Sequence, residues 1–316
     1  MKVFDNFFEK IYDKDIALTG MTEELFAVYV NKLYVSKKNI LIVTSNLVES
    51  NSLYRSISNY VDNVYLFPMD DFLTSEAMAI SPDLMVTRLE TLKEVSSGKP
   101  SIVITNLMGY LRYLPLKKEY LKSVLSLKVN DEISPKELVE KLTNIGYERT
   151  TLVTKTGEIG VRGFVIDIFP LGESNPIRLE FFGDTIDSIR YFDGKSQKSL
   201  SEISSVDIYP YTEIFSNDTF IDEEKRSTKY LSEYGDVANI GGYLDNHITI
   251  YKDKSSMLIN YKQICTDMLE YREEKDIDFK GSYMFDFDDI YENNALHYLT
   301  VDNLDKSLKV INFNSK

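Results

Sequence analysis

The sequence predicts an α/β fold that combines a parallel-sheet unit with a small α+β unit. Strand and helix patterns alternate over residues 1–115, the run Ile-Leu-Ile-Val at 40–43 is uniformly apolar, and the pattern becomes β-rich beyond residue 158. A short apolar run without polar alternation is typical of a strand buried on both faces. Strands that alternate with helices favour a parallel sheet, because each helix carries the chain back across the sheet.

The first 115 residues supply the elements of the parallel-sheet unit. Helices are expected over 22–34 and 47–61, and strands over 40–43, 64–67 and 102–104. In both helices apolar side chains recur at helical spacing. Ser81 followed by Pro82 predicts the start of another helix, since proline is favoured at the first helical position.

The middle of the chain predicts one helix and several strands. Ser134 to Glu137 form a capping-box pattern, and Gly146 is placed to end the helix that follows. Strands are expected over 159–169, 177–182 and 185–192, with a hairpin turn at Gly183-Asp184. Beyond residue 210 the chain is less regular, with a strand over 247–251 and a helix over 255–272.

Composition excludes several classes of protein. The 316 residues suffice for two or three units, and no segment has the roughly 18 continuous apolar residues of a membrane span. No signal peptide is evident, and a single cysteine excludes an intramolecular disulfide framework, so we expect a cytoplasmic protein with no membrane partner. The net charge of −14 disfavours an extended nucleic-acid surface. The two histidines lack metal-ligand spacing, so no metal site is expected.

The position where a nucleotide-hydrolysing domain would bind phosphate has the wrong residues. It retains Gly20 and Thr22, but Glu23 and Glu24 follow where a lysine would be expected. Carboxylates at a helix N-terminus interact favourably with the helix dipole and would repel phosphate. We therefore interpret residues 20–24 as a degenerate phosphate-binding loop and expect no bound cofactor.

Two further features could be mistaken for nucleotide-site motifs. Gly194-Lys195-Ser196 is the only Gly-Lys-Ser in the chain, but it follows a hairpin strand, so we predict a turn. After the strand at 247–251, Lys252 and Lys254 flank a single carboxylate, Asp253. Two cations around one carboxylate are unsuited to binding Mg²⁺.

Residues 157–170 and 177–193 carry a specific resemblance. They resemble the N-terminal region of bacterial transcription-repair coupling factors, which is itself similar to the excision-repair subunit UvrB. The resemblance implies a degenerate helicase-like domain split into parts 1A (1–115) and 1B (211–316), with a UvrA-binding domain 2 (116–210) inserted between them. UvrB carries a DNA-clamping hairpin between the equivalents of Asp71 and Ser81. Only nine residues lie there in this chain, too few for that hairpin.

The resemblance also implies a function. Domain 2 would recruit UvrA by mimicking UvrB, without catalysis, and could take part in autoinhibition through other domains of a longer protein. RNA polymerase and DNA would be bound only by such further domains, and ATP and Mg²⁺ only by a translocase among them. The alternative is a UvrB-like, DNA-dependent ATPase or helicase subunit.

The strand at 177–182 supplies the candidate binding residues. Alternation places Arg178, Glu180 and Phe182 on the face opposite the apolar set. Arginine and aromatic side chains dominate protein-binding hot spots. The resemblance implies that Arg162, Arg178 and Phe182 contact UvrA, and that Arg149 lies near a basic position used by UvrB. Two alternatives remain open. In the first, Arg178 serves the fold by pairing across strands with Asp187 or Glu180. In the second, Phe182 packs under a loop.

Overall fold

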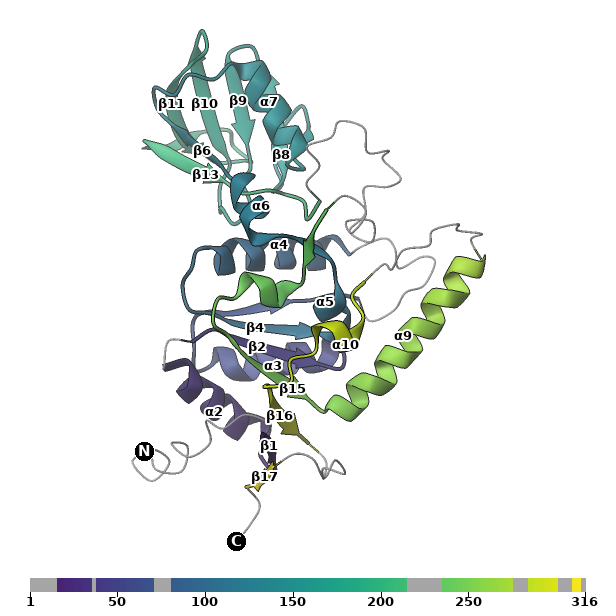
Figure 1. Ribbon diagram of the computed structural model, residues 1–316. Helices are drawn as coiled ribbons and strands as arrows, with labels where there is room; N and C mark the ends of the chain where they lie inside the picture. The colour runs from purple at the N-terminus through teal and green to yellow at the C-terminus, as the bar shows by residue number, and fades with distance from the viewer. Residues whose placement is uncertain are drawn as a thin grey trace. The chain divides into compact units, whose positions relative to one another are not determined.

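The computed structural model describes residues 16–35, 38–70, 81–214, 235–274, 284–300 and 309–313 (Figure 1). The chain forms two compact units: unit 1 from residues 1–113 and 238–316, and unit 2 from residues 114–237. Each contains its own hydrophobic core. The expected limits of domains 1A, 2 and 1B stay a prediction. The segment compared with the clamping hairpin, 72–80, lies outside the described residues.

Unit 1 is built on a seven-stranded sheet with the order β17-β1-β16-β15-β2-β4-β3, in which neighbouring strands are parallel. Its strands are β1 (Ile16–Thr19), β2 (Ile40–Thr44), β3 (Val64–Phe67), β4 (Ile102–Asn106), β15 (Ile248–Lys252), β16 (Leu296–Leu299) and β17 (Lys309–Asn312). Every residue of β2 and β4 is buried, as expected of central strands covered on both faces. The predicted parallel sheet is confirmed.

Helices α3 and α4 lie on opposite sides of this sheet (Figure 1). The helices of unit 1 are α2 (Glu23–Val35), α3 (Leu47–Ser58), α4 (Pro82–Ser96), α5 (Leu107–Leu111), α9 (Lys254–Glu274) and α10 (Phe287–Ile290), with a 3₁₀ turn η3 (Ile240–Tyr243). Asn46 caps α3 by accepting a hydrogen bond from the Glu49 amide at 2.9 Å. Pro82 begins α4, as predicted.

The sequence pattern does not predict β16 and β17. Each has only four residues, too few for a periodic signal to stand out. Strand β16 pairs with β1 on one side and β15 on the other, so His297 lies beside both Ala17 and Tyr251. Its conformation therefore depends on partners far away in the sequence.

Unit 2 contains a six-stranded sheet with the order β12-β11-β10-β9-β8-β7. Its strands are β7 (Glu148–Arg149), β8 (Glu158–Arg162), β9 (Val165–Ile168), β10 (Ile177–Phe182), β11 (Thr185–Phe192) and β12 (Ser199–Ile203). The smaller elements are β5 (Leu114–Pro115), α6 (Lys117–Lys122), β6 (Leu125–Lys128), α7 (Pro135–Asn144), β13 (Ser205–Ile208) and β14 (Val237–Ala238). Leu138 and Leu142 of α7 belong to the same core as Ile166 and Leu179, so the helix covers one face of the sheet.

The predicted ends of α7 are confirmed, but one predicted strand is not. Ser134 Oγ accepts a hydrogen bond from the Glu137 amide at 3.2 Å, and Gly146 follows the helix with φ +96°. The expected strand over 159–169 is two strands, β8 and β9, which pair antiparallel around a turn at Gly163-Phe164. Gly163 has φ +60°, and this left-handed conformation reverses the chain.

Candidate protein-binding face

Strand β10 separates apolar from polar side chains as its alternation predicts. Leu179 and Phe181 point into the core of unit 2. Arg178, Glu180 and Phe182 lie on the opposite face. The Phe182 side chain is 84% exposed, so the alternative in which it packs under a loop is wrong.

The register of three strands brings two arginines onto one carboxylate. Arg178 on β10 lies opposite Asp167 on β9, which in turn lies opposite Gly160 on β8. Arg178 donates from Nε to Asp167 Oδ1 at 2.6 Å and from Nη2 to Oδ2 at 2.8 Å. Arg162 also donates to Asp167 Oδ2. These three residues form what we call the arginine–aspartate cluster, with a net charge of +1.

Arg178 does not take the partners expected from sequence. Glu180 instead accepts from Arg190 Nη1 at 2.8 Å and from the Ser188 hydroxyl at 3.1 Å. The hydrogen bond from Arg190 is the main cause of the lowered pKa of Glu180. The alternative in which Arg178 pairs across strands with Glu180 or Asp187 is therefore wrong in its partners, because Arg178 pairs across strands with Asp167. The expected partners lie on the hairpin of β10 and β11. The actual partner, Asp167, lies on β9, on the other side of β10.

The two arginines differ in accessibility. The Arg178 side chain is 15% exposed, lies 4.5 Å from the centroid of the Phe192 ring and donates to Gln197 Oε1 at 3.2 Å. The hydrogen bond to Asp167 is the main cause of its raised pKa. The Arg162 side chain is 52% exposed. Arg162 is therefore the more accessible positive charge of the cluster, whereas Arg178 is mostly buried.

Sequence reasoning missed Asp167, although its signal is visible in hindsight. This carboxylate stands inside the apolar run Val-Ile-Asp-Ile-Phe, and its side chain is 2% exposed. A charged residue at a buried strand position requires paired partners, because an isolated buried charge is costly. The arginine on the neighbouring strand meets that requirement.

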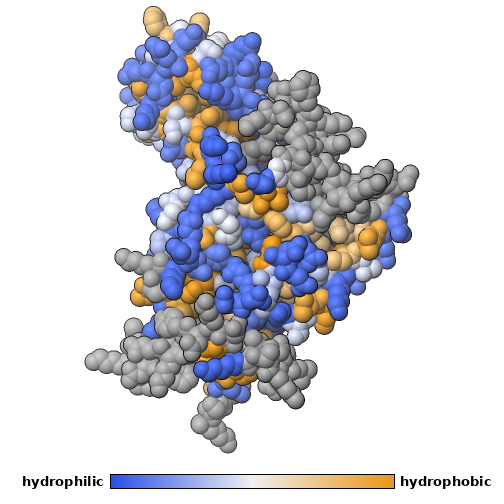
Figure 2. Space-filling view, viewed as in Figure 1, coloured by the Kyte–Doolittle hydropathy of each residue, from blue (hydrophilic) through white to orange (hydrophobic). Residues whose placement is uncertain are grey.

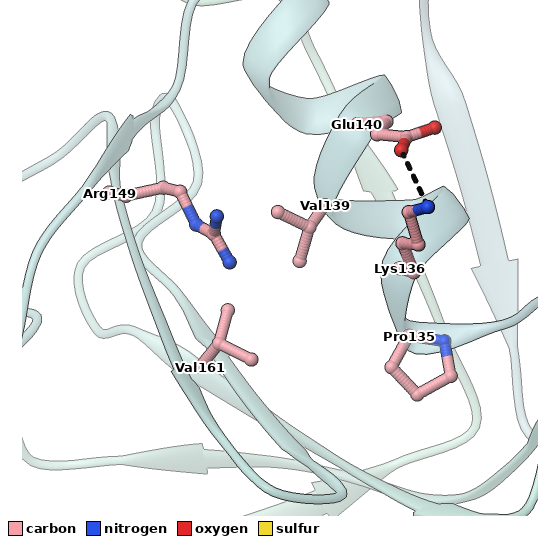
Figure 3. Close-up of a pocket in the computed structure, with 6 residues that line it drawn as sticks. All are labelled: Pro135, Lys136, Val139, Glu140, Arg149 and Val161. Carbon is pink, nitrogen blue, oxygen red and sulfur yellow. Dashed lines mark ion pairs between the residues drawn. The ribbon is translucent and has the colours of Figure 1, made fainter.

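Arg149 lies away from this cluster. It lines a groove of about 300 Å³ together with Pro135, Lys136, Val139 and Glu140 of α7 and Val161 of β8 (Figure 3). The groove is on the face of the sheet that α7 covers, since Val139 belongs to the core on that side. Figure 3 shows the Arg149 guanidinium pointing toward Val139. The structure thus brings Arg162, Arg178 and Phe182 to one face and Arg149 to the other.

Residues 20–24, interpreted from the sequence as a degenerate phosphate-binding loop, connect β1 to the first turn of α2. Gly20 has φ +69°, and Thr22 Oγ1 accepts a hydrogen bond from the Leu25 amide at 3.3 Å. The Glu23 carboxylate accepts from the hydroxyls of Ser52, at 2.9 Å, and Ser56. The helix end therefore carries its own anion, fixed to α3.

Negative charges at and near this loop affect the pKa of Tyr298. Burial, then the charges of Glu23, Asp253 and Glu24, raise the pKa of Tyr298 to about 12. Glu24 itself has a lowered pKa, caused first by a backbone hydrogen bond. The charges of three carboxylates therefore act on the Tyr298 hydroxyl.

The last residue of β15, Lys252, and the residue after it, Asp253, make contacts within the fold. Asp253 accepts from the Thr300 amide at 2.8 Å and its hydroxyl at 2.6 Å, and Lys252 Nζ lies 2.8 Å from Glu49 Oε2. The Gly194-Lys195-Ser196 segment is a turn between β11 and β12, in which the Ser196 amide donates to Asp193 at 2.6 Å. That prediction is confirmed.

Comparison with known proteins places the candidate face within a family match. Residues 125–214 match the family model described as the UvrB interaction domain. Residues 162, 167, 178 and 182 all lie inside this match. The chain resembles transcription-repair coupling factors. This similarity confirms the resemblance predicted from sequence.

Three relatives are proteins described as transcription-repair-coupling factors. Identity is 32% over 237 residues with the Staphylococcus epidermidis RP62A protein, covering 73% of this chain and 20% of the relative. It is 33% over 220 residues with the Staphylococcus aureus MRSA252 protein (68% and 19%), and 30% over 204 residues with the Bacillus subtilis 168 protein (64% and 17%). The chain spans about a fifth of the length of these relatives.

In the part of the chain that the structure describes, no helix is long and apolar enough to cross a bilayer.

Proposed function

We propose that this chain is a non-catalytic recruitment module of transcription-coupled repair, which binds UvrA through the face that carries Arg162 and Phe182. Similarity to transcription-repair coupling factors supports the repair role. One observation carries the choice of face: Phe182 is largely exposed on the same sheet face as Arg162 and Arg178, inside the region that matches the UvrB interaction domain. Such recruitment belongs in the bacterial cytoplasm, where stalled RNA polymerase and excision proteins meet.

The three residues of this face have different proposed roles. Phe182 would enter an apolar depression on the partner and slow dissociation, as buried aromatic anchors do. Arg162 would steer the encounter and pair with a partner carboxylate. Arg178 would hold the face in shape through Asp167. Arg149, which lies on the far face, is proposed to contribute little.

The proposal is tested by measuring the affinity of purified UvrA for Phe182→Ala. Because loss of a hot-spot side chain costs about 2 kcal/mol or more, Kd is expected to rise roughly 30-fold. The melting temperature should not change, since the ring is exposed. Leu200→Ala is the matched control, because Leu200 is an exposed apolar residue of the same unit. Equal affinity of wild type and Phe182→Ala would remove Phe182 from the site.

A second candidate function is a UvrB-like ATPase, favoured by the parallel sheet of unit 1, a scaffold on which nucleotides commonly bind. The residues at the phosphate position speak against it. Glu23 occupies the helix end, and Lys252 and Asp253 are engaged with Glu49 and Thr300. We therefore propose that this chain binds no ATP or Mg²⁺.

We further propose that RNA polymerase, DNA and ATP are bound by other parts of a longer protein, whose domains mask the same face before UvrA arrives. A translocase that is restrained in this way should gain ATPase activity when residues 116–210 are deleted from the longer protein. Unchanged activity would separate recruitment from autoinhibition.

A further inference from the structure

The turn between β8 and β9 exposes a phenylalanine that the resemblance does not assign. Arg162 and Val165 face each other, and Gly163-Phe164 makes the two-residue connection. Gly163 has φ +60°, and a Cβ atom there would meet nothing within 4 Å. Glycine at the first position of such a turn is therefore needed for its conformation alone. The Phe164 side chain is 64% exposed and is not part of the core of unit 2.

A second turn of the same kind lies next to it. Phe182 and Thr185 face each other across Gly183-Asp184, and Gly183 has φ +64°. Strands β9 and β10 are antiparallel neighbours, so both turns occur at the same end of the sheet. The Phe181 amide donates to the Phe164 carbonyl oxygen at 2.9 Å. Phe164 therefore lies opposite Phe181 at this end of the sheet, one position from Phe182, and strand alternation assigns the two exposed rings to the two sides of the sheet end.

The space-filling view shows apolar surface at this end of unit 2, at the top of the picture (Figure 2). Neighbouring strands lie about 4.8 Å apart, so the centres of the two turns are two strand spacings, roughly 10 Å, from each other. A stable protein interface covers about 800 Å² on each partner. An interface centred on Phe182 therefore extends well past the adjacent turn.

We propose that Phe164 is a second apolar anchor for UvrA, which binds the end of the sheet that carries both Phe164 and Phe182. This inference rests on the proposed function and extends it. The matching surface on UvrA is an apolar depression wide enough for two aromatic rings, with a carboxylate placed to meet Arg162. Charge complementarity supports that carboxylate, because the arginine–aspartate cluster carries a net +1 charge and Arg162 is its more exposed cation.

A fold-stabilising role explains Phe164 less well. Turn formation depends on Gly163, and the ring leaves most of its surface to solvent. Exposed apolar residues occur singly on many proteins, but two exposed phenylalanines in and beside neighbouring turns place apolar area at one end of the sheet. Such concentration is typical of the centre of an interface.

The test measures binding of purified UvrA to the whole 316-residue chain by surface plasmon resonance. Phe164→Ala is expected to raise Kd about tenfold, mostly through faster dissociation, with no change in melting temperature. Phe164→Tyr keeps the ring and should bind within about twofold of wild type. Leu152→Ala, another exposed apolar position of unit 2, is the control and should also stay within twofold. The double variant Phe164→Ala/Phe182→Ala should deviate from additivity, because both rings enter one depression.

The outcomes separate this inference from the proposed function. If Phe182→Ala loses affinity while Phe164→Ala binds like wild type, the role of Phe164 is overturned and UvrA recruitment stands. A loss with Phe164→Tyr as large as with Phe164→Ala overturns it too, since the ring is then not what matters. No binding by wild type, or no effect of Phe182→Ala, rejects the proposed face itself and the inference with it.

Discussion

At the scale of single residues, Asp167 connects three neighbouring strands of the candidate face. One buried carboxylate accepts hydrogen bonds from two guanidinium groups on neighbouring strands. Replacing it with alanine leaves Arg178, which is largely buried, without its main counterion. Because breaking a buried pair from one side is costly, Asp167→Ala is expected to lower the free energy of unfolding by about 3 kcal/mol. Urea unfolding followed by circular dichroism measures this, since the chain has no tryptophan.

The two arginines provide the comparison for that prediction. Arg162→Ala should cost only about 1 kcal/mol or less, because half of this side chain is already in water. Glu180→Ala, which breaks the more exposed pair with Arg190, is expected to behave like Arg162→Ala. If Asp167→Ala unfolds at the same urea concentration as these two variants, Asp167 does not organise the face.

At this scale the sequence predicted positions within one strand, but not contacts between residues on different strands. Alternation within β10 correctly placed Leu179 in the core and Phe182 outside, because it needs only one strand. The partner of Arg178 could not be predicted, since it depends on how β9 and β10 pair. The side on which Arg149 lies depends on the position of α7 for the same reason. The roles of these residues in binding UvrA stay predictions.

At the scale of elements, a histidine and a carboxylate connect the start of β15 to the segment after α10. His247 Nε2 lies 2.8 Å from Glu292 Oε1, and Nδ1 lies 2.7 Å from the Leu244 carbonyl oxygen. Burial acts to lower the pKa of His247, but the hydrogen bond and charge of Glu292 outweigh it, so that pKa is raised. The pKa of Glu292 is lowered, although burial opposes this, because of His247.

These directions predict how stability depends on pH. A histidine whose folded pKa exceeds its unfolded pKa of about 6.5 contributes fully below that value. Its contribution is lost as pH rises through the folded pKa. Wild type should therefore lose more stability between pH 6 and pH 9 than His247→Gln does, as measured by urea midpoints. Glu292→Gln should flatten the profile in the same way, and parallel profiles for all three proteins would contradict the role of the pair.

Elements were predictable where their own residues carried a strong pattern. Strand β2 and helices α2, α4 and α7 were evident from apolar runs, periodicity and capping residues. Strands β16 and β17 were not, because each is short and held by pairing with distant strands. The expected strand over 159–169 failed because a single glycine with positive φ turned the chain in its middle. One glycine in an apolar run fits either a bulge or a turn, so the sequence left this open.

At the scale of the whole molecule, the candidate binding residues all lie in one of the two units. The arginine–aspartate cluster and both exposed phenylalanines belong to unit 2. Residues 211–316 carry 21 acidic and 12 basic residues, so much of the net charge of −14 lies outside the candidate face. The net +1 charge of the arginine–aspartate cluster on an acidic protein should direct a partner's carboxylates toward Arg162, because like charges elsewhere disfavour other contacts.

Unit 1 contains a parallel sheet, and Glu23 and Glu24 stand at the helix end after its first strand, so we predict no response to ATP. A ligand present at a thousand times its Kd stabilises the native state by roughly 4 kcal/mol. Micromolar binding would therefore raise the melting temperature by about 10 °C at 1 mM ATP and Mg²⁺. We expect a shift of less than about 1 °C, because Glu23 and its neighbouring carboxylates repel phosphate and Lys252 is paired with Glu49. Glu23→Gln is the comparison variant. It removes one negative charge at the helix end but leaves Lys252 paired with Glu49, so it too should show no ATP-dependent shift.

A clear ATP-dependent shift in wild type, absent with Mg²⁺ alone, would contradict this prediction and favour the ATPase. It would show that the carboxylates at the helix end do not block the site.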